Sequence, residues 1–277
     1  MISKKANIQE VGKLLKDNSL QKTRFFLSSG NNSSIAAESL GDIPNASAVA
    51  EQVKAFGYAK LASFLSDSQC ESLRNDIDDY IESGAFGTLK SAGNDHRFYF
   101  ADRFNVQARD FGQEPRIVWI GEQHLGHAIT SLFTLLARVD PSTDAVGSGG
   151  SWHQDSRAPQ FKAMVYLSDV VSAEDGAFQI FPGSHKLKWK LRSAALRSSP
   201  SLGDRWTAEE VAGLPASLRS ETLTGNAGDC IVFDSSSLHR GHPVRNQPRY
   251  AMTNYLYPQI FNLEQLAKQF PQPHVAA

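Results

Sequence analysis

The chain has 277 residues, of which 41% are hydrophobic and 21% are charged, so it is long enough to bury a sizeable core. Its 28 lysines and arginines nearly balance 29 aspartates and glutamates, and a net charge of -1 argues against non-specific nucleic-acid binding. Only two cysteines occur, Cys70 and Cys230. They exclude a disulfide framework and a thiolate zinc site, and they suit a reducing compartment.

No segment of the sequence has the character of a secretory signal or a membrane span. The amphipathic N-terminus lacks an apolar run of signal-peptide length. No other stretch approaches the roughly 20 apolar residues that a spanning helix needs. We therefore expect a soluble, cytoplasmic protein that acts on neither nucleic acids nor membranes.

Residues 1–50 are expected to form an N-terminal extension, with a short helix around Ile8–Leu15. The first clearly patterned unit is FGYAKLASFLSDSQCESLRNDIDDYIESG. Within it, Tyr58–Ala62 has the character of a short strand that ends in a turn.

A helix is predicted directly after this strand. Ser66 and Gln69 form the pattern of a capping box, in which each side chain satisfies an unpaired amide at the helix start. Gly84 is suited to end the helix. The positions that recur at helical spacing are Cys70, Leu73 and Ile77.

Beyond Gly84 the pattern changes to short apolar runs separated by Gly, Pro and Asp. We interpret these runs as strands of a sandwich or jelly roll, with one helical segment after the first run. The predicted strands are Arg116–Glu122, Leu132–Pro141, the GSWHQD segment, Phe161–Val170, Gly176–His185, Gly228–Asp234 and Pro248–Tyr257.

A long break separates the predicted strands at about residues 186–223. It is too long for a hairpin loop, so we interpret it as a lid or a small subdomain. Thr207 and Glu210 match a second capping box and predict a helix within it. The expected organisation is a main domain over residues 51–265 that carries this insertion, followed by a C-terminal tail at 266–277.

A histidine and an aspartate stand one residue apart in GGSWHQDSRAP, at His153 and Asp155. On a strand, side chains at i and i+2 leave on the same face, with Cα atoms about 6.6 Å apart. Both can then reach one metal ion at bond lengths of roughly 2.0–2.2 Å. A polar strand end explains the pair equally well, so the interpretation as a metal site depends on finding a third ligand.

The third ligand is predicted where a buried-looking strand runs into His239, in CIVFDSSSLHRGHPVRNQPRYAMTNYLY. Two histidines and a carboxylate make the facial triad of non-haem Fe(II) oxygenases, which leaves positions open for a co-substrate and O₂. A structural zinc site would fill all four of its positions. His242 is the alternative ligand, but its His–Pro context puts it after the strand end.

Arg249 stands ten residues after His239, at the start of the last predicted strand. A guanidinium can hold a carboxylate through two parallel hydrogen bonds. An acid gripped by arginine at one end and chelated to iron at the other describes bound 2-oxoglutarate. Arg245 is the alternative anchor, and Thr134 is a candidate for a second contact with the acid.

The run from WHQD through DGAFQIFPGSHK to LHRGHPVRNQPRYA resembles the phytanoyl-CoA dioxygenase-like family of Fe(II)/2-oxoglutarate-dependent oxygenases. The earlier FGYAKLASFLSDSQCESL is similar to that family's opening strand and helix. The resemblance implies a mainly β fold with flanking helices and a double-stranded β-helix (jelly roll, cupin-like) core. It also implies that His153, Asp155 and His239 bind Fe(II) and that Arg249 binds 2-oxoglutarate, with no catalytic residue beyond the metal ligands.

The resemblance further implies an Fe(II)- and 2-oxoglutarate-dependent dioxygenase that uses O₂ to oxidise, most simply to hydroxylate, a C–H bond of a small molecule. An intact Asp155 favours hydroxylation over halogenation, because related halogenases have a small residue in its place. Desaturation, cyclisation and epimerisation use the same site. A metal-dependent hydrolase or isomerase without 2-oxoglutarate is a further alternative, and so is a binding protein without turnover; Arg249 argues against the hydrolase or isomerase.

Three other segments allow two interpretations each. HKLKWKLRSAALR is either a solvated face with Trp189 tucked inward or a lid whose Lys188 and Lys190 recognise an anionic substrate. NDHRFYFADRF either packs in the core or lines a pocket. The VGSGGS string precedes a predicted strand, which favours a flexible loop over the site and not a nucleophile elbow.

The remaining histidines have no partner at ligand spacing. His185, in PGSHK, is interpreted as a turn residue near the mouth of the site. A structural role is expected for the others, which are His96, His124, His127 and His274.

Overall fold

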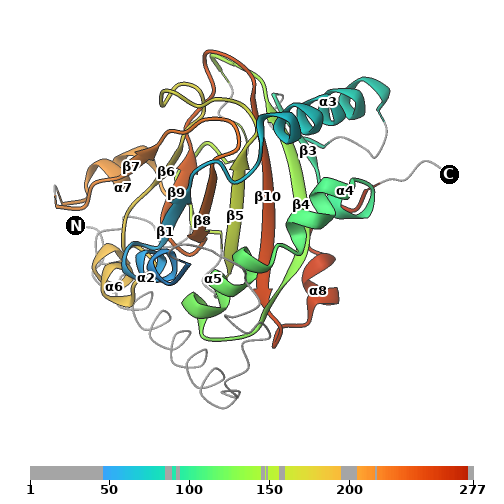
Figure 1. The fold of residues 1–277 in the computed structure, drawn as a ribbon. Coiled ribbons are helices and arrows are strands. Elements are labelled where there is room, and N and C mark those ends of the chain that lie inside the picture. The colour runs from blue at the N-terminus through green and yellow to red at the C-terminus, as the bar shows by residue number, and fades with distance from the viewer. Residues whose placement is uncertain are drawn as a thin grey trace.

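A seven-stranded sheet forms the centre of the computed structural model, which describes residues 46–84, 89–91, 94–144, 147, 149–155, 160–194, 205–215 and 217–273 (Figure 1). Its strand order is β1-β8-β5-β10-β4-β3-β2, and all of the described neighbours pair antiparallel. The strands are β1 (Tyr58–Leu61), β2 (Leu89–Ser91), β3 (Asp95–Phe98), β4 (Ile129–Val139), β5 (Phe161–Tyr166), β8 (Cys230–Asp234) and β10 (Arg249–Pro258).

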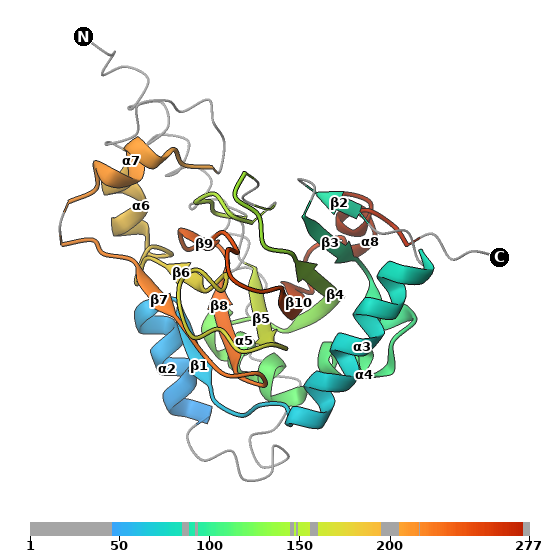
Figure 2. The ribbon, with the colours of Figure 1, turned by 90° about the horizontal axis from the view of Figure 1, so that it is seen from above.

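A smaller sheet of three strands lies across one face of the large sheet. Its order is β7-β6-β9, with β6 (Phe178–Ile180) paired antiparallel to both neighbours, β7 (Glu221–Leu223) and β9 (His239–Gly241). Figure 2 shows the small sheet on one side of the large one and helices on the other. This arrangement confirms the expected mainly β fold with a double-stranded β-helix core.

Helices cover the outer face of the large sheet and the edges of the molecule (Figure 1). The helices are α2 (Ala46–Phe56), α3 (Asp67–Ser83), α4 (Val106–Gly112), α5 (Pro115–Leu125), α6 (Leu187–Ala194), α7 (Ala208–Ala212) and α8 (Leu263–Ala267). Four of them, α2, α3, α4 and α5, share one apolar core with the sheet. None of the helices in the described ranges is both long and apolar enough to cross a membrane.

The alternation of side chains along the strands separates the two faces of the large sheet. On β5, Phe161, Ala163 and Val165 pack in the core beneath the helices. Lys162 and Met164 point the other way and line a cavity. Because the side-chain period of a strand is two, the central strands of this sheet contribute one row to the core and one row to the cavity.

The predicted helix ends are confirmed at α3 and α7. Ser66 and Gln69 make both hydrogen bonds of a capping box, and Gly84 ends α3 with φ 65°, a left-handed conformation that glycine adopts without strain. Thr207 and Glu210 make the second capping box at the start of α7.

The predicted strand at Arg116–Glu122 is wrong, because this segment belongs to helix α5. Its β-branched and aromatic residues are typical of strands. However, Pro115 lies in the first turn of a helix, and Gly126, in a left-handed conformation, ends that helix. Ile117 and Ile120 are then buried at helical spacing. Tertiary packing overrides the local strand preference here.

The predicted strand at GSWHQD is also not formed, since only His153 makes isolated bridges, to Arg205 and His239. The helix predicted at Ile8–Leu15 lies outside the described residues. Helix α2 starts before residue 51 and α8 crosses residue 265, so both elements span the expected domain limits. Those limits stay a prediction.

Candidate metal centre

Main-chain hydrogen bonds bring the two halves of the predicted triad together. The amides of His153 and His239 each donate to the other residue's carbonyl oxygen, with both N···O distances at 2.9 Å. The amide of Asp155 donates to the carbonyl of Ser235 at 3.1 Å. The segment around His153 is thus held against β9 at a defined register, although it is not a regular strand.

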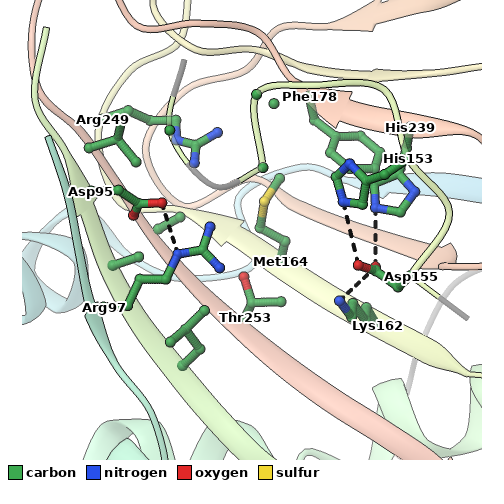
Figure 3. Close-up of a pocket in the computed structure, with 18 of the residues that line it drawn as sticks. Asp95, Arg97, His153, Asp155, Lys162, Met164, Phe178, His239, Arg249 and Thr253 are labelled. Atoms are coloured by element: carbon green, nitrogen blue, oxygen red, sulfur yellow. Dashed lines mark hydrogen bonds and ion pairs between the residues drawn. The ribbon is translucent and has the colours of Figure 1, made fainter. Parts of the chain in front are cut away.

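The three side chains converge on one point at the wall of the cavity (Figure 3). Their ligand atoms all lie within 4.8 Å of one another. Asp155 Oδ1 is 3.4 Å from His153 Nε2, and Asp155 Oδ2 is 3.2 Å from His239 Nε2. The structure therefore brings together the His153, Asp155 and His239 that the sequence predicted.

Hydrogen bonds on the far side of each imidazole select its tautomer. His153 Nδ1 donates to the carbonyl of Ser151 at 2.7 Å, and His239 Nδ1 donates to the carbonyl of Ser237 at 2.8 Å. Burial and the neighbouring His153 lower the pKa of His239, so that ring is neutral. The lone pairs on both Nε2 atoms then face the carboxylate of Asp155, which is a donor set suited to a cation.

A buried lysine completes the charge balance of the triad. Lys162 Nζ lies 2.7 Å from Asp155 Oδ2, and the lysine side chain is only 6% exposed. Burial by itself would raise the pKa of the Asp155 carboxyl, but the adjacent Lys162 ammonium outweighs it and holds that pKa well below its usual range. Asp155 is therefore ionised and able to act as a metal ligand.

The cavity has a volume of about 330 Å³ and lies between the two sheets. Arg249 enters it from the start of β10, and Thr253 lines it from the same strand (Figure 3). Arg249 Nη1 donates to the carbonyl of Gly176 at 2.8 Å, whereas its buried Nε has no hydrogen-bond partner among the described residues. An unpaired buried donor on a guanidinium fits a site for an acid.

A second guanidinium reaches the cavity from β3. Arg97 Nε donates to Asp95 Oδ2 at 2.9 Å, and both residues line the cavity with Tyr99. NDHRFYFADRF therefore serves both purposes that the sequence suggested: alternate residues line the cavity, while Phe98 lies in the core. Which of these residues line the cavity and which are buried in the core depends on the face of β3 from which each side chain leaves.

The alternative candidates lie in other places. His242 lines the cavity but is not in the triad, and Arg245 is exposed on the surface. Thr134 is on the wrong face of β4: its hydroxyl is near Gly112 of α4, 3.1 Å from where a Cβ on that glycine would lie. The prediction that Thr134 contacts the co-substrate is therefore wrong, because alternate side chains of β4 leave on opposite faces and the residue after Thr134 is the one that lines the cavity.

The basic insertion contributes Arg205 to the cavity lining, and Lys188 and Lys190 are not among the described lining residues. Trp189 is buried in a small core with Trp152 and Trp206. This agrees with the interpretation of α6 as a solvated face with an apolar side. The glycines of VGSGGS that the structure describes, which are Gly147, Gly149 and Gly150, line the cavity.

The remaining histidines lie away from the triad. His96 pairs with Asp140 at 3.1 Å, and His124 pairs with the buried Asp234 at 2.9 Å. His185 packs beside His124 and is not part of the cavity lining, so its expected position near the mouth is wrong. His274 lies outside the described residues.

Residues 53–251 match the model of the phytanoyl-CoA dioxygenase (PhyH) family. The chain belongs to this family. The resemblance drawn from its motifs is thereby confirmed, and with it the expectation of an Fe(II)- and 2-oxoglutarate-dependent enzyme. None of the curated proteins matches the chain.

Solved structures of low sequence identity share the fold. The 2-oxoglutarate-dependent epimerase SnoN from nogalamycin biosynthesis has a TM-score of 0.58 at 17% identity, covering 78% of this chain and 84% of that one. HygX from Streptomyces hygroscopicus, with nickel and 2-oxoglutarate bound, has a TM-score of 0.55 at 16% identity, with coverages of 76% and 87%. The carbocyclase SnoK has a TM-score of 0.55 at 16% identity, with coverages of 86% and 96%.

Proposed function

We propose that this PhyH-family protein binds Fe(II) through His153, Asp155 and His239 and uses it with 2-oxoglutarate to hydroxylate a small-molecule substrate. The observation that carries the proposal is the convergence of two imidazole nitrogens and one carboxylate, whose ligand atoms lie within 4.8 Å of one another. This donor set is the facial triad that leaves positions open for other ligands. Bound together, Fe(II) and 2-oxoglutarate supply the oxidant for C–H bonds in this family.

Arg249 is proposed to hold the distal carboxylate of 2-oxoglutarate. Its guanidinium is fixed by the carbonyl of Gly176, and its Nε has no hydrogen-bond acceptor in the part of the chain that the structure describes. Gly241 leaves room beside it, because a Cβ there would lie 3.0 Å from Arg249 Nη1. A carboxylate can approach the guanidinium fork only where no side chain blocks it.

The protein's own contribution is orientation and an enclosed site. The carbonyls of Ser151 and Ser237 hold the two imidazoles, Lys162 holds Asp155, and the sheets shield the cavity between them. The described lining contains aromatic rings at Tyr99 and Tyr255 as well as charged groups. That lining supports a small organic substrate.

Hydroxylation is one of several outcomes that this site allows. Structures with this fold include an enzyme described as an epimerase and one described as a carbocyclase. Others contain nogalamycin RO or hygromycin B. Epimerisation, cyclisation or desaturation of a small molecule is therefore the alternative to hydroxylation, and a neutral or anionic substrate is compatible with the basic residues in the cavity.

An anaerobic titration tests the proposed cofactor site. Fe(II) and then 2-oxoglutarate are added to the purified apo-protein, and visible absorption is recorded for the wild type and for His153→Ala. We expect a charge-transfer band in the wild type that is lost in the variant. Tight Fe(II) binding without any such band in the wild type would contradict the proposal and favour a hydrolase or isomerase.

The reaction type is tested separately with candidate substrates under ¹⁸O₂. A substrate that stimulates succinate formation is expected to gain one labelled oxygen atom if it is hydroxylated. A product without label that has lost two hydrogens or inverted one centre would replace hydroxylation with desaturation, cyclisation or epimerisation.

A further inference from the structure

Lys162 is a buried cation for which the sequence suggested no function. It lies on the cavity side of β5 and pairs across the sheet with Tyr255 of β10 and Phe233 of β8. Its side chain is 6% exposed, and lysine is rarely buried to this degree without a specific partner. In Figure 3 its ammonium group points at Asp155 and not at the open part of the cavity.

Two contacts hold the ammonium group in place. Lys162 Nζ donates to Asp155 Oδ2 at 2.7 Å, and it sits 3.8 Å from the centre of the Tyr255 ring. The Tyr255 ring is itself stacked on Phe133 with centroids 4.4 Å apart. A cation over an aromatic face is attracted to the ring, so Tyr255 fixes the end of the lysine that meets the carboxylate.

A carboxylate has two oxygens, and both can bind one metal ion. Asp155 is anchored through its main chain by the bond from its amide to Ser235, which leaves the side-chain torsions to other contacts. A hydrogen bond from a charged donor is about twice as strong as a neutral one. Lys162 is therefore able to set which oxygen of Asp155 faces an ion.

We propose that Lys162 is a positioning residue that engages one oxygen of Asp155 and so restricts this ligand to a single bond with the metal. The inference rests on the proposed function of the triad. With one bond from each of His153, Asp155 and His239, the ion keeps the positions that a chelating 2-oxoglutarate and O₂ require. A carboxylate released from Lys162 would take a further position and compete with the keto acid.

The test separates ion binding from co-substrate binding. Lys162→Met keeps the length and apolar stem of the side chain and removes the donor, while Lys162→Arg keeps a charged donor. For each folded variant, Mn(II) affinity is measured by calorimetry, and 2-oxoglutarate affinity is measured by anaerobic absorption with Fe(II). If Lys162 only stabilised the structure, its replacement would lower the affinities for Mn(II) and for 2-oxoglutarate together.

We expect Lys162→Met to bind Mn(II) within a factor of about three of the wild type, or more tightly, since a cation has been removed beside the ion. Its 2-oxoglutarate affinity is expected to fall by about 10-fold or more, because the second oxygen of Asp155 would compete with the keto acid for the ion. Lys162→Arg is expected to recover most of that loss. An unchanged 2-oxoglutarate affinity in Lys162→Met, or loss of ion binding in the folded variant, would overturn the proposal.

Lys60→Met is the matched control. Lys60 Nζ pairs with the buried Asp229 at 2.8 Å on the same sheet, in a lysine–aspartate contact of nearly the same length outside the cavity lining. Its removal is expected to leave both affinities unchanged. If Lys60→Met loses 2-oxoglutarate affinity to the same extent, the effect is a general loss of an ion pair and the proposal fails.

A measurement on the wild type does not depend on how the variants fold. Infrared difference spectra of the ¹³C-aspartate-labelled protein with and without Mn(II) report how a carboxylate binds the ion. A wide separation of the antisymmetric and symmetric stretches is expected for one-oxygen binding, and a narrow separation would overturn the proposal. Absence of the 2-oxoglutarate band in the wild type would instead contradict the proposed function itself.

Discussion

At the scale of single residues, the protonation and orientation of the three predicted metal ligands depend on the hydrogen-bond partner that each ligand has within the protein. The carbonyls of Ser151 and Ser237 accept hydrogen bonds from Nδ1 of the two triad histidines, so both Nε2 atoms are directed at the same point. Lys162 keeps Asp155 ionised. These partners determine protonation and orientation, which the ligand identities leave open.

Arg249→Lys tests the anchor for 2-oxoglutarate. Arg249 donates to the carbonyl of Gly176 through Nη1, and its Nε has no partner among the described residues. The single ammonium of lysine cannot reproduce both donors. Loss of one charge-assisted hydrogen bond costs about 1.5–3 kcal/mol. We expect the 2-oxoglutarate dissociation constant to rise by about 10- to 100-fold, with Mn(II) affinity unchanged.

Arg245→Lys serves as the control for that prediction. Arg245 is exposed, lies only four residues before Arg249 and is not among the described cavity-lining residues. The same titration is expected to give the wild-type dissociation constant. Equal effects of the two substitutions would contradict the placement of the co-substrate at Arg249.

At the scale of elements, strand alternation decides which side chains can reach the site. On β10, Arg249 and Thr253 face the cavity, whereas Met252 and Leu256 pack beneath the helices. A shift of one residue in the register would exchange the two rows and remove Arg249 from the cavity. The turns that set these registers are therefore as important to the site as the ligands.

Gly228→Ala tests one such turn, which leads into β8. Gly228 has φ 93°, and a Cβ there would lie 2.3 Å from the carbonyl oxygen of Leu65, whose amide donates to the Gly228 carbonyl. A left-handed residue that also clashes with backbone should cost about 2–4 kcal/mol in the free energy of unfolding. Urea denaturation followed by circular dichroism measures it.

Gly84→Ala is the matched comparison for the turn. Gly84 is also left-handed, with φ 65°, but no atom of the described residues lies within 4 Å of where its Cβ would be. Only the conformational cost remains, which is about 1 kcal/mol. If both alanine variants lose the same stability, the contact with Leu65 contributes nothing.

At the scale of the whole molecule, buried ionisable groups tie stability to pH. Burial lowers the pKa of His185 to about 4, opposed by the attraction of Asp234 and reinforced by the nearby His124. In the unfolded chain this histidine has its ordinary pKa of 6.5. Between those values the unfolded state binds a proton that the folded state excludes, so acidification favours unfolding.

We therefore expect stability to fall as the pH drops from about 6.5 to about 4, with His185 contributing about 1–3 kcal/mol of the loss. His185→Gln removes this titration and should flatten the dependence of unfolding free energy on pH over that range. Urea denaturation at several pH values measures both proteins. Parallel curves for the two proteins would show that His185 does not carry the effect.

Much of the fold and the site could be read from local pattern. The capping boxes at Ser66 and Thr207 involve residues three apart, so short-range geometry determined them. The segment at Arg116–Glu122 was predicted wrongly, because its strand composition competes with packing that only neighbouring elements supply. The same limit applies to Thr134, whose face depends on the register of β4.

The sequence by itself determined the family, the β-rich core, the four residues of the predicted cofactor site and the ends of two helices. The helix ends depend on residue type and short spacing, whereas the family, the core and the site residues follow from the resemblance of motifs that lie far apart along the chain. Tertiary structure decided that Lys162 meets Asp155, that Arg97 and Tyr99 face the cavity and that Arg205 alone among the described insertion residues lines it. Lys162 and Asp155 are close in sequence, but their contact, like the cavity lining, depends on sheet order and register, which no local pattern encodes.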